Sequence, residues 1–323
     1  MKRPHGFDLE LAETSLVAST QSAQFQVLIF LILCFCWGST FIALKEGLTL
    51  LPPLVFAAAR FILAALLMGS FIALSGRSFK RPQAKHLTRL LLATTLGMTL
   101  NYGLLFWGTQ HLPSGLSGLV SFAAVALAMT LLSLALGLER RSWNKWLGLI
   151  CGLAGLLLLM LPKFTTGAIE QFMGIAAIGL GGLAYAAASL IIRPLLRIYG
   201  ALTITLWQMM VGGLSFLGLS LLFADISTLR HLAQPNIFLS LVYLVLVGSL
   251  LGFGIYNYLL TTWEPSRVTL YNFLCPVIAL ILGMLVYGER VEGLEPPITL
   301  LLLALFINYL PSLKKASPLF TQK

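Results

Sequence analysis

The sequence predicts an all-α integral membrane protein with ten transmembrane helices in two inverted five-helix repeats, and three observations support this fold class. First, 58% of the 323 residues are hydrophobic and only 10% are charged, with a mean hydropathy of +0.92, whereas an ordinary soluble domain carries about 25% charged residues. Second, the apolar residues form stretches of roughly the 20 residues that a helix needs to cross a bilayer. Third, the basic residues gather in alternate connections between these stretches.

Ten apolar stretches follow one another with only short turns between them, which leave no room for a soluble domain. They are expected at 27–46, 53–74, 88–109, 115–138, 146–162, 174–192, 201–223, 237–260, 267–288 and 297–311. The fifth and tenth are the shortest and lie at the lower limit for a bilayer span. Because an open-ended segment satisfies its own backbone in lipid only as a helix, each span is predicted to be helical.

The spans divide the chain into two repeats with polar ends. We expect a cytoplasmic polar N-terminal tail over 1–26, a first five-helix repeat over 27–162, a connecting loop over 163–173, a second repeat over 174–311 and a cytoplasmic C-terminal tail over 312–323. The N-terminal tail carries acidic residues directly after Lys2 and Arg3, which does not fit a cleaved signal peptide.

The orientation in the membrane follows from the basic residues. With a cytoplasmic N-terminus, sixteen of the 21 lysines and arginines lie inside and four lie outside, and the remaining one is Arg60 within the second span. This is the bias of the positive-inside rule, and an odd number of spans would remove it. Both termini are therefore expected in the cytoplasm. Anionic headgroups and insertion topology explain the net charge of +10 better than a nucleic-acid partner does.

A weak internal repeat relates the two halves. The pairs Glu139-Arg140 and Glu289-Arg290 end the fourth and ninth spans, 150 residues apart. Because five spans is an odd number, the second half enters the membrane in the opposite orientation, as in carriers that alternate access around a central site. We interpret Glu139 and Glu289 as structural residues that cap the helix–helix turn; a role in substrate binding or gating is the alternative.

Polar side chains within the spans are the candidates for a central cavity, since such groups usually face a bundle interior or a wet chamber. The candidates are Trp37, Thr40, Arg60, Asn101, Tyr102, Tyr185, Ser189, Trp207, Gln208, Tyr256, Asn257, Tyr271 and Asn272. An amide beside an aromatic residue recurs in four spans, and interhelical hydrogen bonding is the alternative explanation for it. Tyr185 and Ser189 are included because they correspond to Trp37 and Phe41 of the first span. The small-residue pair Gly248 and Gly252 predicts close helix packing.

Arg60 lies about eight residues into the second span, and two positions are open to it. Its guanidinium either faces the cavity, where it could bind a substrate carboxylate through two hydrogen bonds, or extends along its flexible stem to the outer interface.

Residue types that the spans lack argue against proton coupling through a carboxylate, against metal binding and against catalysis. No acidic residue lies in the middle of a span, so we do not expect proton coupling through a buried carboxylate. The four cysteines match no metal-binding pattern, and we expect no metal and no cofactor. The spans contain no paired carboxylates and no nucleophile or phosphate-loop motif, so a membrane-embedded enzyme is a poor alternative.

Several motifs together resemble the drug/metabolite transporter superfamily, and in particular its EamA-type permeases. They are WGSTFIALKEGL with the following PPL and AAARF, the basic connection after the second span, the first Glu-Arg pair, and LCPVIALILGMLVYGER. The resemblance covers roughly 27–311. It departs at Ala126, which stands where the second half has Pro276, and in the tenth span, which lacks glycine. Pro276 itself is expected to kink the ninth helix.

The resemblance implies a function. Members of this family are bacterial inner-membrane exporters of amino acids and other small metabolites, so we expect a multi-pass inner-membrane carrier, monomeric or homodimeric, with a central cavity between its halves. A carrier of nucleotide sugars or lipid-linked substrates is the alternative within the superfamily.

Overall fold

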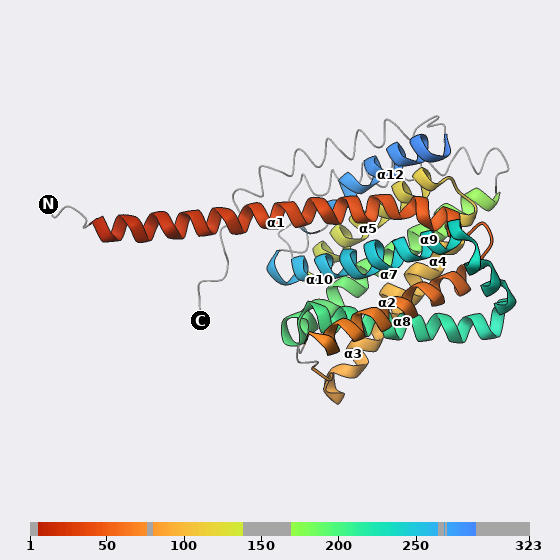
Figure 1. The fold of residues 1–323 in the computed structure, drawn as a ribbon, viewed down its shortest axis with the longest axis horizontal. Helices are drawn as coiled ribbons and strands as arrows, with labels where there is room; N and C mark the ends of the chain where they lie inside the picture. The colour runs from red at the N-terminus through yellow and green to blue at the C-terminus, as the bar shows by residue number, and fades with distance from the viewer. Residues whose placement is uncertain (1–5, 76–79, 138–168, 264–267, 269, 289–323) are drawn as a thin grey trace.

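The computed structural model describes residues 6–75, 80–137, 169–263, 268 and 270–288, and every regular element in these segments is helical (Figure 1). Seven of the described helices are long and apolar enough to cross a membrane, and the apolar helix α12 (Tyr271–Tyr287) is shorter. The prediction of an all-helical membrane protein is therefore confirmed. The fifth and tenth spans lie outside the described residues, as do Glu139 and Glu289, so ten helices remain a prediction.

The described helices of the first half correspond in order to the first four expected spans. They are α1 (Gly6–Gly47), α2 (Pro53–Leu74), α3 (Ala84–Thr94), the π-helical segment η1 (Thr95–Leu100), α4 (Asn101–Gln110) and α5 (Ser114–Ala135). The second span coincides with α2, because Pro53 occupies the first turn, where its missing N–H needs no partner. The third span corresponds to α3, η1 and α4, which follow one another without a break.

The second half contains the same kind of elements. They are α7 (Ile169–Tyr199), α8 (Ala201–Phe223), the 3-10 helix η2 (Ile226–Ala233), α9 (Pro235–Tyr243), the π-helical segment η3 (Leu244–Leu251), α10 (Gly252–Thr262) and α12. Gly200 separates α7 from α8 with a φ of +81°, a conformation open to glycine at little cost. Helix α12 continues through Pro276, which removes the N–H that would bond to the carbonyl of Asn272.

Helix α1 is longer than the membrane span that the sequence predicts. The part of α1 that could cross a membrane, Gln24–Gly47, agrees with the span expected at 27–46. The helix itself starts at Gly6, and its first part projects beyond the other helices (Figure 1). The physical reason is that no proline or glycine interrupts the chain between Gly6 and Gly38, so the polar segment continues the apolar helix as one element. Helix α7 likewise begins at Ile169, inside the expected connecting loop.

The two π-helical segments are the main feature of the fold that the sequence did not predict. Each lies in the middle of a continuous helical span, η1 between α3 and α4 and η3 between α9 and α10. A π-helical turn displaces backbone groups from the regular i→i−4 pattern and is often found at functional sites.

The helices pack into a bundle around one large core. Helix α2 packs on α8, α5 packs on α7 and α12, α4 packs on α7, and α1 packs on α12. Large apolar side chains such as Leu74, Leu222 and Leu285 are at least three-quarters exposed on the outside of the bundle, as expected where helices contact lipid. Apart from Trp207, the polar and aromatic candidates from the sequence are buried inside the bundle.

Candidate functional site

A small cavity lies inside the bundle, between α1, α2, α4, α5, α7 and α12. Its volume is about 60 Å³, enough for roughly four water molecules. Its lining consists of Trp37, Thr40, Phe41, Leu44, Arg60, Asn101, Tyr102, Leu105, Ser121, Phe122, Val125, Tyr185 and Tyr271. Seven of the thirteen candidates from the sequence therefore line one cavity.

Arg60 provides the positive charge of this cavity. Its side chain is 3% exposed, so the structure places it inside the bundle and not at the outer interface. Nε donates a hydrogen bond to Ser249 Oγ at 2.9 Å. The guanidinium carbon lies 5.1 Å from the ring centroid of Phe61 and 5.3 Å from that of Tyr102, distances at which cation–π attraction stabilises a buried cation. Within the described part of the chain, no carboxylate forms an ion pair with Arg60.

The π-helical segment η3 brings its backbone and Ser249 to the residues of α1 and α2. Besides the bond from Arg60 to Ser249, Trp37 Nε1 donates a hydrogen bond to the carbonyl of Gly248 at 3.2 Å. A Cβ at Gly248 would lie 2.8 Å from Arg60 Nη2, and a Cβ at Gly252 would collide with the indole of Trp37. The glycine pair thus permits close packing, as expected. The side chains that pack against it are two site candidates, Arg60 and Trp37.

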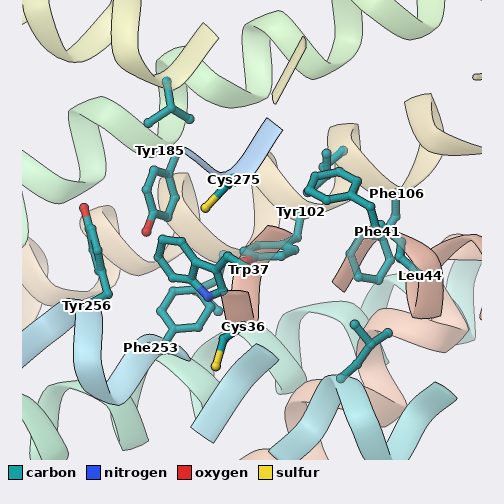
Figure 2. Close-up of a cluster of buried hydrophobic side chains, with 14 of the residues drawn as sticks. Cys36, Trp37, Phe41, Leu44, Tyr102, Phe106, Tyr185, Phe253, Tyr256 and Cys275 are labelled. Atoms are coloured by element: carbon teal, nitrogen blue, oxygen red, sulfur yellow. The ribbon is translucent and has the colours of Figure 1, made fainter. Parts of the chain in front are cut away.

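Trp37 is surrounded by aromatic rings. Its ring centroid lies 4.8 Å from Tyr271, 5.1 Å from Tyr256, 5.5 Å from Phe253 and 6.4 Å from Tyr185. Figure 2 shows the indole of Trp37 between Tyr185, Tyr256 and Phe253, with Tyr102 on the other side. Trp37, Tyr185, Phe253, Tyr256 and Tyr271 form a compact aromatic group at the cavity, and we call these five residues the Trp37 cluster.

The hydroxyl groups near the Trp37 cluster differ in their partners. Tyr256 donates a hydrogen bond to Ser189 Oγ at 2.8 Å, and Ser189 donates to the carbonyl of Tyr185 at 2.9 Å. Tyr185 Oη is buried and has no hydrogen-bond partner among the described residues. Tyr185 contributes to the cavity lining, but its hydroxyl oxygen is itself buried.

A second group of candidates forms a separate polar cluster. Asn257 Nδ2 donates to Thr205 Oγ1 and to Gln208 Oε1, both at 2.8 Å. Neither Asn257 nor Gln208 lines the cavity, and the bonds between them are the interhelical contacts that the sequence left as the alternative. Asn272 is fully buried and is also absent from the lining.

Trp207 lies in a different place from the other candidates. It borders an open groove of about 700 Å³ on the outside of the bundle, together with Gly69, Leu206, Met210 and Arg81. This groove is formed by α2, α3, α8 and the connection that precedes α3.

The sequence missed two kinds of cavity residue. Phe41, Leu44, Leu105, Phe122 and Val125 are apolar, and in a membrane helix nothing in their type distinguishes a cavity wall from a core or lipid contact. Ser121 lies in a helix rich in small residues, where serine is common as a packing residue. An observed cavity is needed to identify either kind.

Charged side chains fasten the end of α1. Lys45 Nζ donates to the carbonyl of Leu112 at 2.6 Å. The Glu46 carboxylate accepts from Asn236 Nδ2 at 2.6 Å and from the Tyr287 hydroxyl at 2.9 Å. These bonds link α1 to the connection between α4 and α5, to α9 and to α12, directly after cavity residue Leu44. We call them the Lys45–Glu46 clasp.

One carboxyl outside the spans has a shifted pKa. The pKa of Asp225 lies below its usual value, because the carboxylate accepts hydrogen bonds from the hydroxyl and the backbone N–H of Ser227, both at 2.9 Å. Asp225 precedes η2 and lies outside the cavity lining, so it is a capping residue of that turn.

Comparison with known proteins agrees with this architecture. The EamA-like transporter family matches residues 24–161 and again 172–310. An Escherichia coli K12 protein named "Uncharacterized inner membrane transporter YedA" is 30% identical over 265 residues, covering 80% of this chain and 82% of the relative. A Salmonella typhimurium protein named "Probable amino-acid metabolite efflux pump" is 28% identical over 294 residues, covering 86% and 92%.

A solved structure shares the fold. It is titled "Crystal structure of protein", and it superposes with a TM-score of 0.67 at 17% sequence identity, covering 91% of this chain and 99% of its own. Together with the two family matches, which span most of the sequence, these similarities show that the chain belongs to the EamA-like transporter family of membrane proteins.

Proposed function

We propose that this protein is an inner-membrane carrier that exports small carboxylate-bearing metabolites by alternating access. The observation that carries the proposal is Arg60, a buried cation on the wall of a small aromatic cavity, without a carboxylate partner in the described part of the chain. A buried charge is costly unless it is paired. A substrate carboxylate supplies the missing partner, and the guanidinium can bind both of its oxygens.

The proposed mechanism needs two halves that move against each other. We infer ten helices in two inverted five-helix repeats with both termini in the cytoplasm. The two separate family matches support this division. The π-helical segments and Pro276 interrupt regular helix bonding beside the cavity, and such interruptions are sites where helices bend.

Two contacts are suited to act as gates in such a cycle. In the inferred orientation, the Lys45–Glu46 clasp closes the outer end of the cavity, because its bonds tie α1 to three neighbouring segments. The Trp37 cluster closes the opposite side. Export requires that the clasp opens while the Trp37 cluster stays packed, and that the reverse change admits cargo from the cytoplasm.

The single charge favours small metabolites over the alternative cargo. A nucleotide sugar or a phosphate-linked lipid carries several negative charges and calls for several basic residues, whereas Arg60 is the one basic residue among the described residues of the cavity lining. The names of the relatives favour a carrier over an enzyme, and the efflux name of the Salmonella relative supports the direction.

Transport by purified protein tests the proposal. The full chain is reconstituted into liposomes, and uptake of a panel of radiolabelled small carboxylates is compared with that of Arg60→Gln. We expect uptake to fall by about 10- to 100-fold in the variant, since a hydrogen bond to a charged group contributes about 1.5–3 kcal/mol. Arg230→Gln, which changes an exposed arginine of η2, serves as the control and should leave uptake unchanged. Equal uptake by wild type and Arg60→Gln would contradict the proposal.

A further inference from the structure

We infer that the groove on the outside of the bundle, between α2, α3 and α8, binds an anionic phospholipid of the surrounding membrane, with an acyl chain in the groove and the phosphate at Arg81. The groove holds about 700 Å³, within the range of about 300–1,000 Å³ of ligand pockets. This inference goes beyond the proposed function and is independent of it, because Arg60 and its cavity take no part in it.

The body of the groove suits an acyl chain. It lies along the last turns of α2 and the first turns of α3 and α8, which meet at one end of the bundle (Figure 1). An acyl chain covers such a surface without loss of hydrogen bonds, but apolar contact alone does not select one lipid over another. The apolar lining residues are Gly69, Ile72, Ala73, Pro82, Leu87, Leu206 and Met210.

The charge at the end of the groove provides the selectivity. Arg81 lines the groove and is exposed, and Lys80 beside it is exposed as well. Residues 47–138 and 171–224 contain no aspartate or glutamate, and these ranges include all of α2, α3 and α8. The elements that form the groove therefore offer Arg81 no carboxylate. A guanidinium binds two oxygens of a phosphate, and basic pockets between transmembrane helices bind anionic headgroups.

The connection that carries Arg81 is fixed before any lipid binds. Pro82 restricts the backbone directly after Arg81. The backbone N–H of Gln83 donates to Tyr199 Oη at 3.0 Å, and His86 Nδ1 lies 2.8 Å from the same oxygen. These bonds fasten the start of α3 to the end of α7, so little ordering is needed when a ligand binds at Arg81.

The position of the groove favours a lipid over a second copy of the chain. Trp207 lines the groove from the second turn of α8, and tryptophan is enriched where the acyl region meets the headgroups. In the inferred orientation, this end lies in the cytoplasmic leaflet, whose surface is anionic. A symmetric contact between two copies would bring the same uncompensated basic residues together.

Matched lipids test the inference on the full-length, delipidated protein in detergent. Native mass spectrometry compares the binding of dioleoylphosphatidylglycerol and dioleoylphosphatidylcholine, which have the same chains and differ in net charge. We expect the anionic lipid to bind at a concentration at least about fivefold lower, since a basic residue near an anionic lipid contributes about 1 kcal/mol. Equal binding of the two lipids would overturn the inference. So would equally strong competition by glycerol 3-phosphate, which carries the phosphate without the chains.

A pair of arginine variants separates a site from general attraction to a basic surface. Arg81→Gln should remove the preference for the anionic lipid. Arg89→Gln is the matched control, because it changes an exposed arginine of the same helix end that is absent from the groove lining. Arg89 follows Leu87 by two residues and therefore lies on the opposite face of α3. Equal losses in both variants would overturn the inference.

A variant that fills the groove tests the place of the acyl chain. A Cβ at Gly69 would meet only Leu206 Cδ1, at 3.9 Å, so a larger side chain there extends into the groove. We expect Gly69→Phe to weaken the binding of both lipids and Gly69→Ala to leave it unchanged. Unchanged lipid binding in Gly69→Phe would overturn the inference, whereas the proposed function stands or falls separately with carboxylate uptake in Arg60→Gln.

Discussion

Arg60 and Gln208 occupy the same place in two helices that pack against each other, since each is the eighth residue of its helix, α2 or α8. Both side chains are buried. Their surroundings differ. Arg60 borders the cavity and donates to Ser249 of η3, whereas Gln208 accepts from Asn257 in a polar cluster that lies apart from the cavity.

This difference separates two uses of polar residues in a membrane bundle. Gln208 and Asn257 share their hydrogen-bonding capacity between helices, which stabilises the bundle by a modest amount. Arg60 keeps charged donors beside an open space. Burial and polarity are common to both regions, so the property that identifies a binding residue is the cavity that its polar atoms face.

The largest effect on stability is expected when a second positive charge is placed in the polar cluster of Gln208 and Asn257. Gln208→Arg places a second cation in a closed cluster whose partner, Asn257, is neutral. We expect a loss of about 3–5 kcal/mol in the free energy of unfolding, the cost of an uncompensated buried charge. The change is measured by thermal unfolding in detergent and by the yield of monodisperse protein.

A matched control distinguishes this effect from the introduction of any arginine. Gln234→Arg changes an exposed glutamine between η2 and α9 and should leave the unfolding temperature unchanged. If Gln208→Arg were as stable as this control, the polar cluster would be open to water, and the contrast between the two regions would fail.

Sequence reasoning predicted the helices well where local chemistry defines their ends. The bounds of α2 and α8 coincide with the expected spans, because Pro53 and Gly200 mark turns. The span expected at 27–46 agrees with the apolar part of α1, Gln24–Gly47, but the helix extends back to Gly6, since nothing in the polar segment stops it. The π-helical segments have no sequence period of their own, and Gly248 predicted packing without revealing that Arg60 is its neighbour.

The candidate site was predictable only in part, for a physical reason. Intramembrane polarity pointed to Arg60 and Asn101, but it also pointed to Gln208 and Asn257, which hydrogen-bond to each other apart from the cavity. Helical periodicity shows which residues lie inside a bundle. The distance between helices, which decides whether a polar group meets a partner or a cavity, depends on tertiary packing.

A smaller effect is expected from crowding Arg60 without changing its charge. In Gly248→Ala, the new Cβ would lie 2.8 Å from Arg60 Nη2 and 2.9 Å from Thr40 Cγ2, so Arg60 must shift from its present position. Overpacking of this kind costs about 1–3 kcal/mol. We expect uptake into liposomes to fall roughly tenfold or more. Gly254→Ala is the control, because a Cβ there meets nothing within 4 Å, and a similar loss in the control would show that helix α10 tolerates no added side chain.

A change in the Gln208–Asn257 cluster should lower the stability of the protein and leave its substrate affinity unchanged. Asn257→Leu removes the donor to Thr205 and Gln208 and leaves Gln208 Oε1 without this partner. We expect a loss of about 1–2 kcal/mol in the free energy of unfolding, with unchanged substrate affinity. Thermal unfolding and ligand titration of the same preparation measure both quantities, and a weaker affinity at normal stability would assign this cluster to the substrate path.

The smallest effect is expected at the contact that orients Arg60. Ser249→Ala removes the acceptor of Arg60 Nε, which donates at 2.9 Å, but it keeps the charge and the cavity. A single hydrogen bond of this kind contributes about 1 kcal/mol, which corresponds to about a fivefold weaker affinity for a carboxylate. Ser249→Thr retains the hydroxyl and should restore most of the affinity. Because Gln208 has no comparable contact with η3 in the described structure, an equal loss of affinity in Gln208→Ala would show that both regions hold the substrate, and the asymmetry between them would have to be abandoned.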